Sequence, residues 1–335
     1  MIVCQTPLRV SFFGGGTDLP YYFRESEKGG QVLSAAIDKS TYVIANKLYR
    51  DKIVINWSKK EEADSYDKIK HEYVREVLKY FKIDFGIEIT TLADIPSEGS
   101  GLASSSSILV GLINTISTLI GSPMNQREIA ELAVMIEIDM LGKPIGLQDQ
   151  YAVSCGGINH IKFDGVSQYD CYDENGFGHD LSDTIEVNKL NYDPYFFNKF
   201  VIVNTGSHRM SSKILSKQIL SIHEKQEQYD KIFTYCSCGI EYYKNGMYKE
   251  FGELLNSSME QKRQLSDGIV TRYMDSLRQK ADNVVGWKIC GAGGGGYILL
   301  MTDDPQKTQQ SLEDYDSYNI NIDNQGTRIV FNNEH

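Results

Sequence analysis

A run of glycines and serines from Pro96 to Ser107, with the sequence PSEGSGLASSSS, has the clearest chemical potential in this chain. Its glycines allow a tight turn that presents successive backbone N–H groups, and the apolar segment 104–120 that follows is predicted to be a helix. The helix start adds unpaired N–H donors and the positive end of its dipole, which suits an anion. The alternative, a turn with one serine cap, needs one serine rather than four. The run therefore predicts a phosphate-binding loop, although no Gly-Lys-Ser/Thr follows as in a Walker A loop.

A second glycine run, Gly291–Gly296, has five glycines in six positions and lies between two apolar segments. So many glycines carry a high cost in chain entropy, which a plain hairpin turn does not require. The run indicates either a close approach of the backbone to a ligand or a mobile turn, and its sequence alone does not separate the two.

Two carboxylates, Glu137 and Asp149, are spaced so that both could face one site. Glu137 falls near the end of a predicted helix, and Asp149 follows a turn that contains Gly142, Pro144 and Gly146. A pair of carboxylates beside a polyphosphate is what Mg²⁺ binding and the activation of a hydroxyl group require. The alternative is structural: Asp149 caps the next helix and Glu137 is a solvated surface charge.

Arg9 lies inside the apolar extended segment 6–13 and needs a partner, because an unpaired buried cation is very unfavourable. The glycines at 14–16 end this segment and leave room for a ligand, and Thr17 and Asp18 offer groups that bind hydroxyls. A catalytic role for Arg9 and a purely structural salt bridge are equally open from the sequence.

These residues are set in a series of predicted strands and helices. In the first half, strands are expected over 6–13, 51–57, 86–92 and 156–163, with one or two strands over 31–49, and helices over 67–81, 104–120, 125–141 and 147–153. In the second half, strands are expected over 200–204, 284–290, 297–301 and 327–331, and helices over 211–259 with a break near Gly246, 270–280 and 305–315. This order predicts an α+β protein with a domain boundary between residues 183 and 199.

The composition restricts the classes of protein to which the chain belongs. Its 335 residues are enough for about two domains, and 41% hydrophobic with 24% charged residues is ordinary for a soluble globular protein. The net charge of −11, from 34 Lys+Arg against 45 Asp+Glu, argues against a nucleic-acid binder. No apolar run reaches the ~18 residues of a membrane helix, and the first residues lack the pattern of a signal peptide. Six scattered cysteines predict reduced thiols in a cytoplasmic protein.

Taken together, the motifs resemble the signatures of the GHMP kinase superfamily, which includes galactokinase, homoserine kinase and mevalonate kinase. Three signatures occur in the expected order: Pro7-x-Arg9-Val10-(x3)-Gly14-(x2)-Thr17-Asp18, Pro96-(x2)-Gly99-Ser-Gly101-Leu102-x-Ser104-Ser105, and Gly291-x-Gly293-Gly294-Gly295. The resemblance covers about residues 3–300. It implies an α+β fold with a ribosomal protein S5 domain 2-like N-terminal domain (residues 1–190) and a ferredoxin-like C-terminal domain (residues 191–335), with the active site between them.

The resemblance also implies an ATP-dependent kinase that uses Mg²⁺ and phosphorylates a small-molecule hydroxyl. Asp149 would orient or deprotonate this hydroxyl, and Arg9 would keep Asp149 ionised and stabilise the charge of the transferred group. Glu137 with Ser104 or Ser105 would hold Mg²⁺. The residues implied in ATP binding are Glu98, Gly99, Ser100, Gly101, Leu102, Ala103, Ser104, Ser105 and Ser106. Those implied in substrate binding are Gly15, Gly16, Thr17, Asp18, Gly293 and Gly294, the last two in a loop that closes over the site.

The first signature is similar to that of the sugar-kinase branch that contains the D-glycero-D-manno-heptose 7-phosphate kinases. Galactokinases carry Glu-His where this chain has Gly15 and Gly16, so there is room for a substrate larger than a hexose. We therefore expect a heptose 7-phosphate that is phosphorylated at its anomeric hydroxyl. Arg209, at the start of the predicted helix over 211–259, would bind the distal phosphate. The alternative is that Arg209 is solvated and a nearby serine only caps the helix.

Two other functions stay open. One is a kinase with another acceptor, such as fucose, galactose or a different hexose, and the other is a catalytically silent protein that binds a sugar or nucleotide. Retention of both Arg9 and Asp149 argues against the silent form. The expected partners are ATP and a sugar or sugar phosphate, with no nucleic acid and no membrane. The oligomeric state, a homodimer included, is left open by the sequence.

Overall fold

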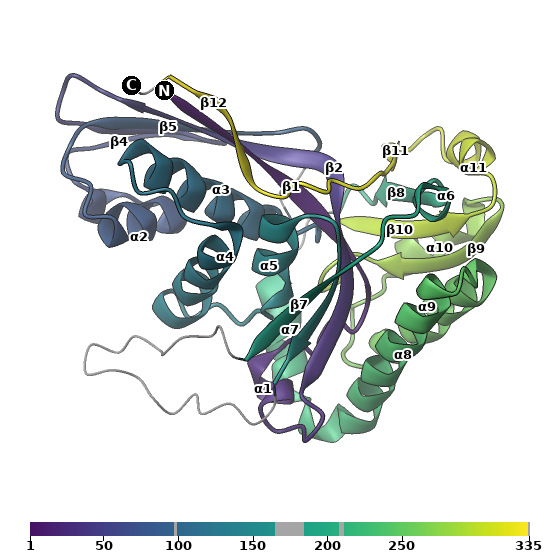
Figure 1. Ribbon diagram of the computed structural model, residues 1–335. Coiled ribbons are helices and arrows are strands. Elements are labelled where there is room, and N and C mark those ends of the chain that lie inside the picture. The colour runs from purple at the N-terminus through teal and green to yellow at the C-terminus, as the bar shows by residue number, and fades with distance from the viewer. Residues whose placement is uncertain (97–98, 165–183, 208–210, 334–335) are drawn as a thin grey trace.

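Two β-sheets with their covering helices form the computed structural model of the chain, which describes residues 1–96, 99–164, 184–207 and 211–333. The larger sheet occupies one half of the molecule and the smaller sheet the other (Figure 1). Strands β1 (Ile2–Phe13) and β2 (Gly30–Lys47) run antiparallel and extend from the first half toward the second. These two long strands therefore connect the parts of the fold that must position the site.

The larger sheet has the strand order β12-β1-β2-β5-β3-β4 in the described residues, while β6 pairs with β2 and β7 pairs with β6. Its other strands are β3 (Ile53–Asn56), β4 (Lys60–Ala63), β5 (Ile87–Ala93), β6 (Ile158–Phe163), β7 (Ile185–Leu190) and β12 (Arg328–Asn332). Neighbours are antiparallel except β3 and β5. The segment 31–49, for which one or two strands were expected, forms the single strand β2, which has partner strands on both sides.

Helices cover one face of this sheet (Figure 1). They are α2 (Glu72–Tyr80), α3 (Ser104–Leu119), α4 (Gln126–Val134) and α5 (Gln148–Cys155), and the short α1 (Pro20–Phe23) follows β1. Helix α3 is apolar on nearly every side because it packs on β1 and β2 and is flanked by α2, α4 and α5. Its burial holds its N-terminus, which follows the glycine–serine run, in a defined place.

The helices expected over 67–81 and 125–141 have different boundaries in the structure. The helix expected over 67–81 begins at Glu72, after a short 3₁₀ turn at Tyr66–Lys68. The helix expected over 125–141 starts with a complete capping box between Asn125 and Glu128. It then ends at Val134 and continues as a π-helical turn, which periodicity does not distinguish from an α-helix.

The smaller sheet has the antiparallel order β11-β8-β10-β9. Its strands are β8 (Phe200–Asn204), β9 (Val284–Ile289), β10 (Tyr297–Thr302) and β11 (Ser317–Asn319). The helices of this half are α6 (Pro194–Phe197), α7 (Ser211–Leu220), α8 (Gln226–Lys244), α9 (Tyr248–Arg263), α10 (Arg272–Lys280) and α11 (Pro305–Ser311), with a 3₁₀ turn at His223–Lys225. Helices α8 and α9 pack side by side, and α9 packs on β9 (Figure 1). In the described residues no helix is both long and apolar enough to cross a membrane.

A shared hydrophobic core joins the two halves. The ring centroid of Phe12 in β1 lies 5.2 Å from that of Phe200 in β8, and that of Phe13 lies 4.9 Å from that of Phe251 in α9. All four side chains are buried. Because close packing rather than a linker sets the relative position of the sheets, side chains from both halves face one cavity in a fixed arrangement.

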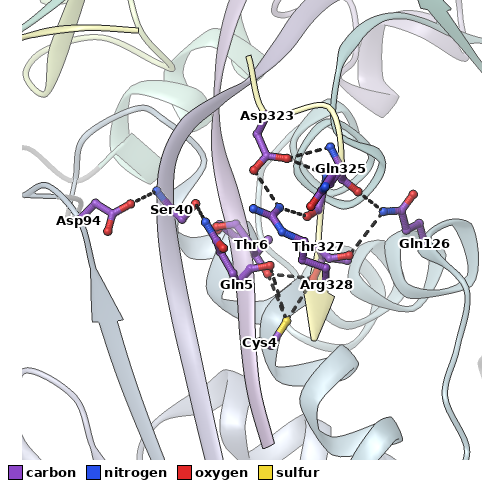
Figure 2. A network of polar contacts seen from close by, with 12 residues as sticks. Cys4, Gln5, Thr6, Ser40, Asp94, Gln126, Asp323, Gln325, Thr327 and Arg328 are labelled. Carbon is purple, nitrogen blue, oxygen red and sulfur yellow. Dashed lines mark hydrogen bonds and ion pairs between the residues drawn. The ribbon is translucent and has the colours of Figure 1, made fainter. Parts of the chain in front are cut away.

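The chain returns to the larger sheet near its C-terminal end, where β12 pairs with β1. The hydroxyl of Thr327 lies 2.9 Å from that of Thr6 and 3.3 Å from the Sγ atom of Cys4 (Figure 2). The predicted assignment of residues 191–335 to the second domain therefore does not hold for this last strand. A strand over 327–331 was expected, but its partner was not, because the pairing joins residues more than 300 positions apart.

Candidate active site

A cavity of about 1030 Å³ lies between the two halves and brings together most of the predicted site residues. The first half contributes β1 with the turn after it, the glycine–serine run, and the segment from the π-helical turn to α5. The second half contributes α7, α9, β9 and the start of the second glycine run. The structure therefore has a large cavity between the two halves, where the active site was predicted.

Arg9 and Asp149 form an ion pair at the wall of this cavity. The Nη2 and Nε atoms of Arg9 lie 2.6 and 2.8 Å from Oδ1 of Asp149, and Nη1 donates to the carbonyl oxygen of Gly101 at 2.8 Å. The side chain of Arg9 is 4% exposed and that of Asp149 is 24% exposed, so the carboxylate keeps an accessible edge. Arg9 thus connects three segments: its own strand, the glycine–serine run and α5.

Asp149 lies inside the first turn of α5 rather than at its cap. The cap position is Leu147, and no side chain makes a capping hydrogen bond there. The structural alternative for Asp149, a helix cap, is therefore wrong. Its carboxylate is held by Arg9 and lines the cavity.

Glu137 is a buried carboxylate on the π-helical turn Met135–Met140, and only 1% of it is exposed. It accepts hydrogen bonds from the hydroxyls of Tyr73 and Ser106, at 2.7 and 2.8 Å, and from the amide of Gln150. Burial raises the pKa of Glu137 to about 7, although the three hydrogen bonds oppose this shift. The alternative of a solvated surface charge is wrong, and the side chain lines the cavity.

The start of α3 points into the cavity, because Ser104, Ser105 and Ser106 all line it. Ser106 donates to Glu137, whereas Ser105 is exposed and does not contact this carboxylate. The metal-binding role of Ser105 stays a prediction. The structure adds Ser106 as the serine that links the helix start to Glu137.

The two glycine runs pack backbone against backbone. A Cβ atom on Gly101 would lie 2.4 Å from the carbonyl oxygen of Cys290, and one on Gly291 would lie 2.7 Å from the Cα atom of Gly101. A Cβ atom on Gly296 would lie 2.3 Å from the carbonyl oxygen of Ser100. These contacts explain why both runs are rich in glycine. The sequence suggested a close approach of the second run to a ligand, whereas the close approach in the structure is between the two loops.

Gly293 and Gly294 do not contact the cavity, so their predicted role in substrate binding is corrected. The amide of Gly294 donates to the carbonyl oxygen of Ile269 at 2.8 Å, and a Cβ atom on Gly293 would lie 2.6 Å from the same oxygen. From the second glycine run, Gly291 and Ala292 line the cavity. The middle glycines serve the packing of the loop.

Gly101→Ala is expected to destabilise the protein much more than Gly121→Ala. Both glycines have a positive φ, 73° and 77°, so each alanine carries about 1–2 kcal/mol of backbone strain. A Cβ atom on Gly121 meets nothing within 4 Å, whereas one on Gly101 displaces the second loop. This overpacking is expected to add about 1–3 kcal/mol. Urea unfolding of the two variants measures the difference, and equal losses would contradict the contact between the loops.

Thr17 holds the turn after β1 and does not line the cavity. Its hydroxyl lies within hydrogen-bonding distance of the carbonyl oxygens of Gly14, at 2.9 Å, and Gln31, at 2.8 Å, and the side chain is fully buried. Its predicted contact with substrate is therefore corrected to a structural role. The residue type alone does not separate the two roles, because a threonine hydroxyl is suited to either.

Gly15, Gly16 and Asp18 line the cavity as a group. The carboxylate of Asp18 accepts from the amide of Gly16 at 2.7 Å and from Nε2 of Gln148 at 3.1 Å. Burial raises the pKa of Asp18, because the charged form is poorly solvated there. Their predicted role in sugar binding stays a prediction that this position supports.

The remaining predicted nucleotide contacts have different outcomes. Gly99, Ser100 and Ala103 line the cavity. Leu102 is fully buried, and its carbonyl oxygen accepts from the backbone amide of Arg9 at 3.0 Å. Glu98 and Arg209 lie outside the described residues, so both assignments stay predictions from the sequence.

Two buried lysines of the cavity, Lys262 and Lys288, were missed by the sequence analysis. Lys262 donates to the carbonyl oxygen of Gly291, and burial lowers its pKa to about 8. Lys288 lies in β9, directly before the second glycine run. A lone cation in an apolar strand is the signal that drew attention to Arg9, and the same signal applies to Lys288. Lys262 has no such signal, because α9 is rich in charged residues.

Comparison of the sequence with known protein families identifies the family of this chain. Residues 71–157 match the GHMP kinases N terminal domain, and residues 240–317 match the GHMP kinases C terminal domain. The chain belongs to the GHMP kinase family. The resemblance carried by the three signatures is therefore confirmed.

This GHMP kinase is similar to several curated relatives. It is 36% identical over 173 residues to D-glycero-alpha-D-manno-heptose 7-phosphate kinase of Campylobacter jejuni, and the match covers 48% of this chain and 50% of that enzyme. It is 24% identical over 346 residues to L-fucokinase/L-fucose-1-P guanylyltransferase of Bacteroides fragilis, which covers 90% of this chain and 34% of that protein. The chain thus spans half or less of the length of these relatives.

Solved structures confirm the expected fold. The crystal structure of a D-glycero-D-manno-heptose 1-phosphate kinase from Bacteroides thetaiotaomicron matches over 100% of both chains, with a TM-score of 0.77 and 20% identity. A galactokinase from Lactococcus lactis matches over 98% of this chain and 94% of its own, with a TM-score of 0.73 and 20% identity. The α+β fold with two GHMP kinase domains is therefore confirmed.

Proposed function

We propose that this GHMP kinase transfers the γ-phosphoryl group of ATP to a hydroxyl group of a sugar. The observation that carries the proposal is the Arg9–Asp149 ion pair, placed in the cavity that also receives the start of α3. A carboxylate with an accessible edge can orient a hydroxyl, while a helix start and a buried guanidinium favour phosphate charge. The kinase names of the curated relatives support the same reaction.

In this proposal the start of α3 binds the phosphates of ATP. The backbone N–H groups at Ser104, Ser105 and Ser106 precede the first full helical hydrogen bonds, and all three residues line the cavity. Their hydroxyls add further donors beside the same N–H groups. The nucleotide is thereby placed next to the ion pair, because Arg9 also bonds to the carbonyl oxygen of Gly101 in the preceding loop.

The residues of this cavity fit a magnesium ion that is shared with the nucleotide. The described residues contain no cluster of three or more His, Cys, Asp or Glu side chains, and Mg²⁺ is often held by one or two carboxylates together with substrate phosphates. Glu137 with a serine hydroxyl of the α3 start, Ser105 or Ser106, would hold it. When bound, the ion neutralises charge on the phosphate oxygens.

Asp149 would act on the acceptor and Arg9 on Asp149. The carboxylate of Asp149 accepts the hydrogen bond of the reacting hydroxyl and takes its proton as the phosphoryl group is transferred. Arg9 keeps this carboxylate in place through two short contacts, and its own orientation is fixed by the carbonyl oxygen of Gly101. Its charge also offsets the negative charge that develops on the transferred group.

For the acceptor we propose D-glycero-D-manno-heptose 7-phosphate, phosphorylated at its anomeric hydroxyl. The 36% identity with the heptose 7-phosphate kinase of Campylobacter jejuni supports this acceptor. Gly15 and Gly16 line the cavity beside Asp18 without side chains of their own, in agreement with a sugar larger than a hexose. We also propose a cytoplasmic location, which the cysteine content predicts. Arg209 is proposed to bind the 7-phosphate.

A sugar screen tests the proposal directly. ADP release is measured with MgATP and each of four acceptors: heptose 7-phosphate, the unphosphorylated heptose, L-fucose and D-galactose. We expect heptose 7-phosphate to have the highest kcat/KM. L-fucose is the second candidate, because the similarity to the fucokinase of Bacteroides fragilis extends over 90% of this chain. A protein that binds sugar but releases no ADP with any acceptor is a silent binder and contradicts the proposal.

Glu137→Gln is expected to raise the Mg²⁺ concentration for half-maximal rate by about 10-fold, because a neutral amide replaces the carboxylate that would hold the ion. The pKa of about 7 sets the pH dependence. Above pH 7 the carboxylate of the metal-free protein is ionised and binds Mg²⁺, and below pH 7 protons compete, by up to ~10-fold per pH unit. Mg²⁺ titrations at pH 6 and pH 8 should therefore differ in the wild type and coincide in the variant. Identical Mg²⁺ dependence in both proteins would exclude a metal role for Glu137.

A further inference from the structure

Lys288 is a buried lysine that lines the cavity and has no hydrogen-bond acceptor among the described residues. It is 3% exposed and lies in β9. The other two buried cations of the cavity have acceptors: Arg9 bonds to Asp149, and Lys262 bonds to the carbonyl oxygen of Gly291. Because a buried ammonium without a partner is unfavourable, its place in the cavity wall points to a group on a ligand.

The neighbours of Lys288 do not neutralise it. Lys262 and Arg9 are themselves positive, and burial raises the pKa of the nearby thiols of Cys236 and Cys290, which are therefore uncharged at neutral pH. Burial and the two cations hold the pKa of Lys288 well below its ordinary value. An oxygen atom of a ligand that accepts from Nζ would favour the charged form again.

The Oγ atom of Ser11 and the Oε1 atom of Gln148, both buried in the cavity wall, also lack hydrogen-bond partners among the described residues. The amide nitrogen of Gln148 donates to Asp18, which leaves Oε1 as the free acceptor. A Cβ atom built on Gly15 would lie 3.4 Å from Ser11 Oγ, 3.5 Å from Gln148 Nε2 and 4.0 Å from Lys288 Nζ. The three side chains therefore surround one small space beside Gly15, inside the cavity.

We propose that Ser11, Gln148 and Lys288 bind a hydroxyl group of the acceptor sugar in the space beside Gly15; this inference rests on the proposed sugar-kinase function. A hydroxyl both donates and accepts, so it pairs with Lys288 Nζ as acceptor and with Gln148 Oε1 as donor, while Ser11 serves either way. A phosphate oxygen only accepts and would leave Gln148 Oε1 unpaired.

This hydroxyl is a neighbour of the reacting one. Gln148 and Asp149 are consecutive in α5 and both line the cavity, so in this proposal they bind different hydroxyl groups of one sugar. Gln148 also donates to Asp18, which couples the subsite to the carboxylate expected to bind sugar hydroxyls. This subsite thus determines which sugars are positioned so that their reacting hydroxyl can receive the phosphoryl group. Its residues are Ser11, Gln148 and Lys288.

Two independent variants test the subsite. Lys288→Met keeps the aliphatic stem and removes the ammonium group. Gly15→Ala fills the space itself, and it suits the fold, because Gly15 is not among the glycines with positive φ and its Cβ contacts are at ordinary van der Waals distances. We expect both variants to raise the KM for the sugar by about 10- to 100-fold, the effect of losing a charge-assisted hydrogen bond, and to leave the KM for ATP within about twofold.

Thermal unfolding separates binding from structure. Removal of an unpartnered buried ammonium is expected to leave the Tm of Lys288→Met equal to or above that of the wild type. A lower Tm in Lys288→Met together with an unchanged KM for the sugar would show that Lys288 is structural and would overturn the proposal. A raised KM for ATP with an unchanged KM for the sugar would assign Lys288 to an ATP phosphate and would also overturn it.

Calorimetric titration with heptose 7-phosphate, the free heptose, L-fucose and D-galactose keeps this inference apart from the proposed function. Sugars that bind the wild type but bind both variants at least tenfold more weakly support the subsite, even if no ADP is released and the kinase function fails. Turnover in the wild type with unchanged sugar binding in the variants overturns the subsite alone. Failure of all four sugars to bind the wild type overturns both.

Discussion

Asp149→Asn is expected to lower kcat by ~10²–10⁴-fold while the affinity for ATP stays unchanged, because the amide cannot accept the proton of the sugar hydroxyl. The replacement is nearly isosteric, and its carbonyl oxygen can still accept from Arg9, which contacts a single oxygen of Asp149 in the structure. The loss therefore reports on the missing base rather than on a displaced α5. Steady-state kinetics with the preferred sugar and equilibrium binding of ATP give the two quantities.

Asp139→Asn is a matched control for this change. Asp139 is exposed on the π-helical turn that carries Glu137, and it does not line the cavity. We expect its kcat to stay within about twofold of the wild type. Near-normal turnover in Asp149→Asn would mean that Asp149 only positions other groups, and the proposed role as base would then be wrong.

Arg9→Lys is expected to lower kcat by ~10²–10³-fold although the positive charge is kept. The planar guanidinium reaches Asp149 and the carbonyl oxygen of Gly101 in different directions, which one ammonium on a flexible stem cannot reproduce. Arg9→Met removes the charge as well, so we expect a further loss of rate. The difference between the two variants measures how much of the effect of Arg9 is geometry and how much is charge.

Arg328→Lys supplies the corresponding control at a site outside the cavity. The Nη1 atom of Arg328 donates to a carboxylate oxygen of Asp323 at 2.8 Å and to the carbonyl oxygen of Gly326 at 2.9 Å, the same combination of partners as at Arg9 (Figure 2). We expect unchanged kinetics and at most about 1 kcal/mol of lost stability. Equal losses of activity in Arg9→Lys and Arg328→Lys would indicate that the effect is general destabilisation.

Much of the fold follows from local features of the sequence. The apolar segment after the glycine–serine run is helix α3, the capping box at Asn125 starts α4, and the alternating segment at 51–57 contains β3. Each of these depends on residues near one another in the chain, where backbone propensity and capping act directly. Arg9 was identified in the same way, since one cation in an apolar strand requires a partner wherever that partner lies.

The sequence by itself determined that a phosphate-binding loop, a buried arginine and two carboxylates occur in the order of a GHMP kinase. Only the tertiary structure decided what each of them contacts. Arg9 pairs with Asp149, which lies 140 positions away in the chain, and the hydroxyl of Thr17 lies near the carbonyl oxygen of Gln31. The second glycine run packs on the first, and Gly293 does not line the cavity. The position of Lys288 beside Gly15 is also set by packing, because β9 packs on α9 and α9 shares a core with β1. Such contacts depend on the packing of distant elements, which local propensity does not encode.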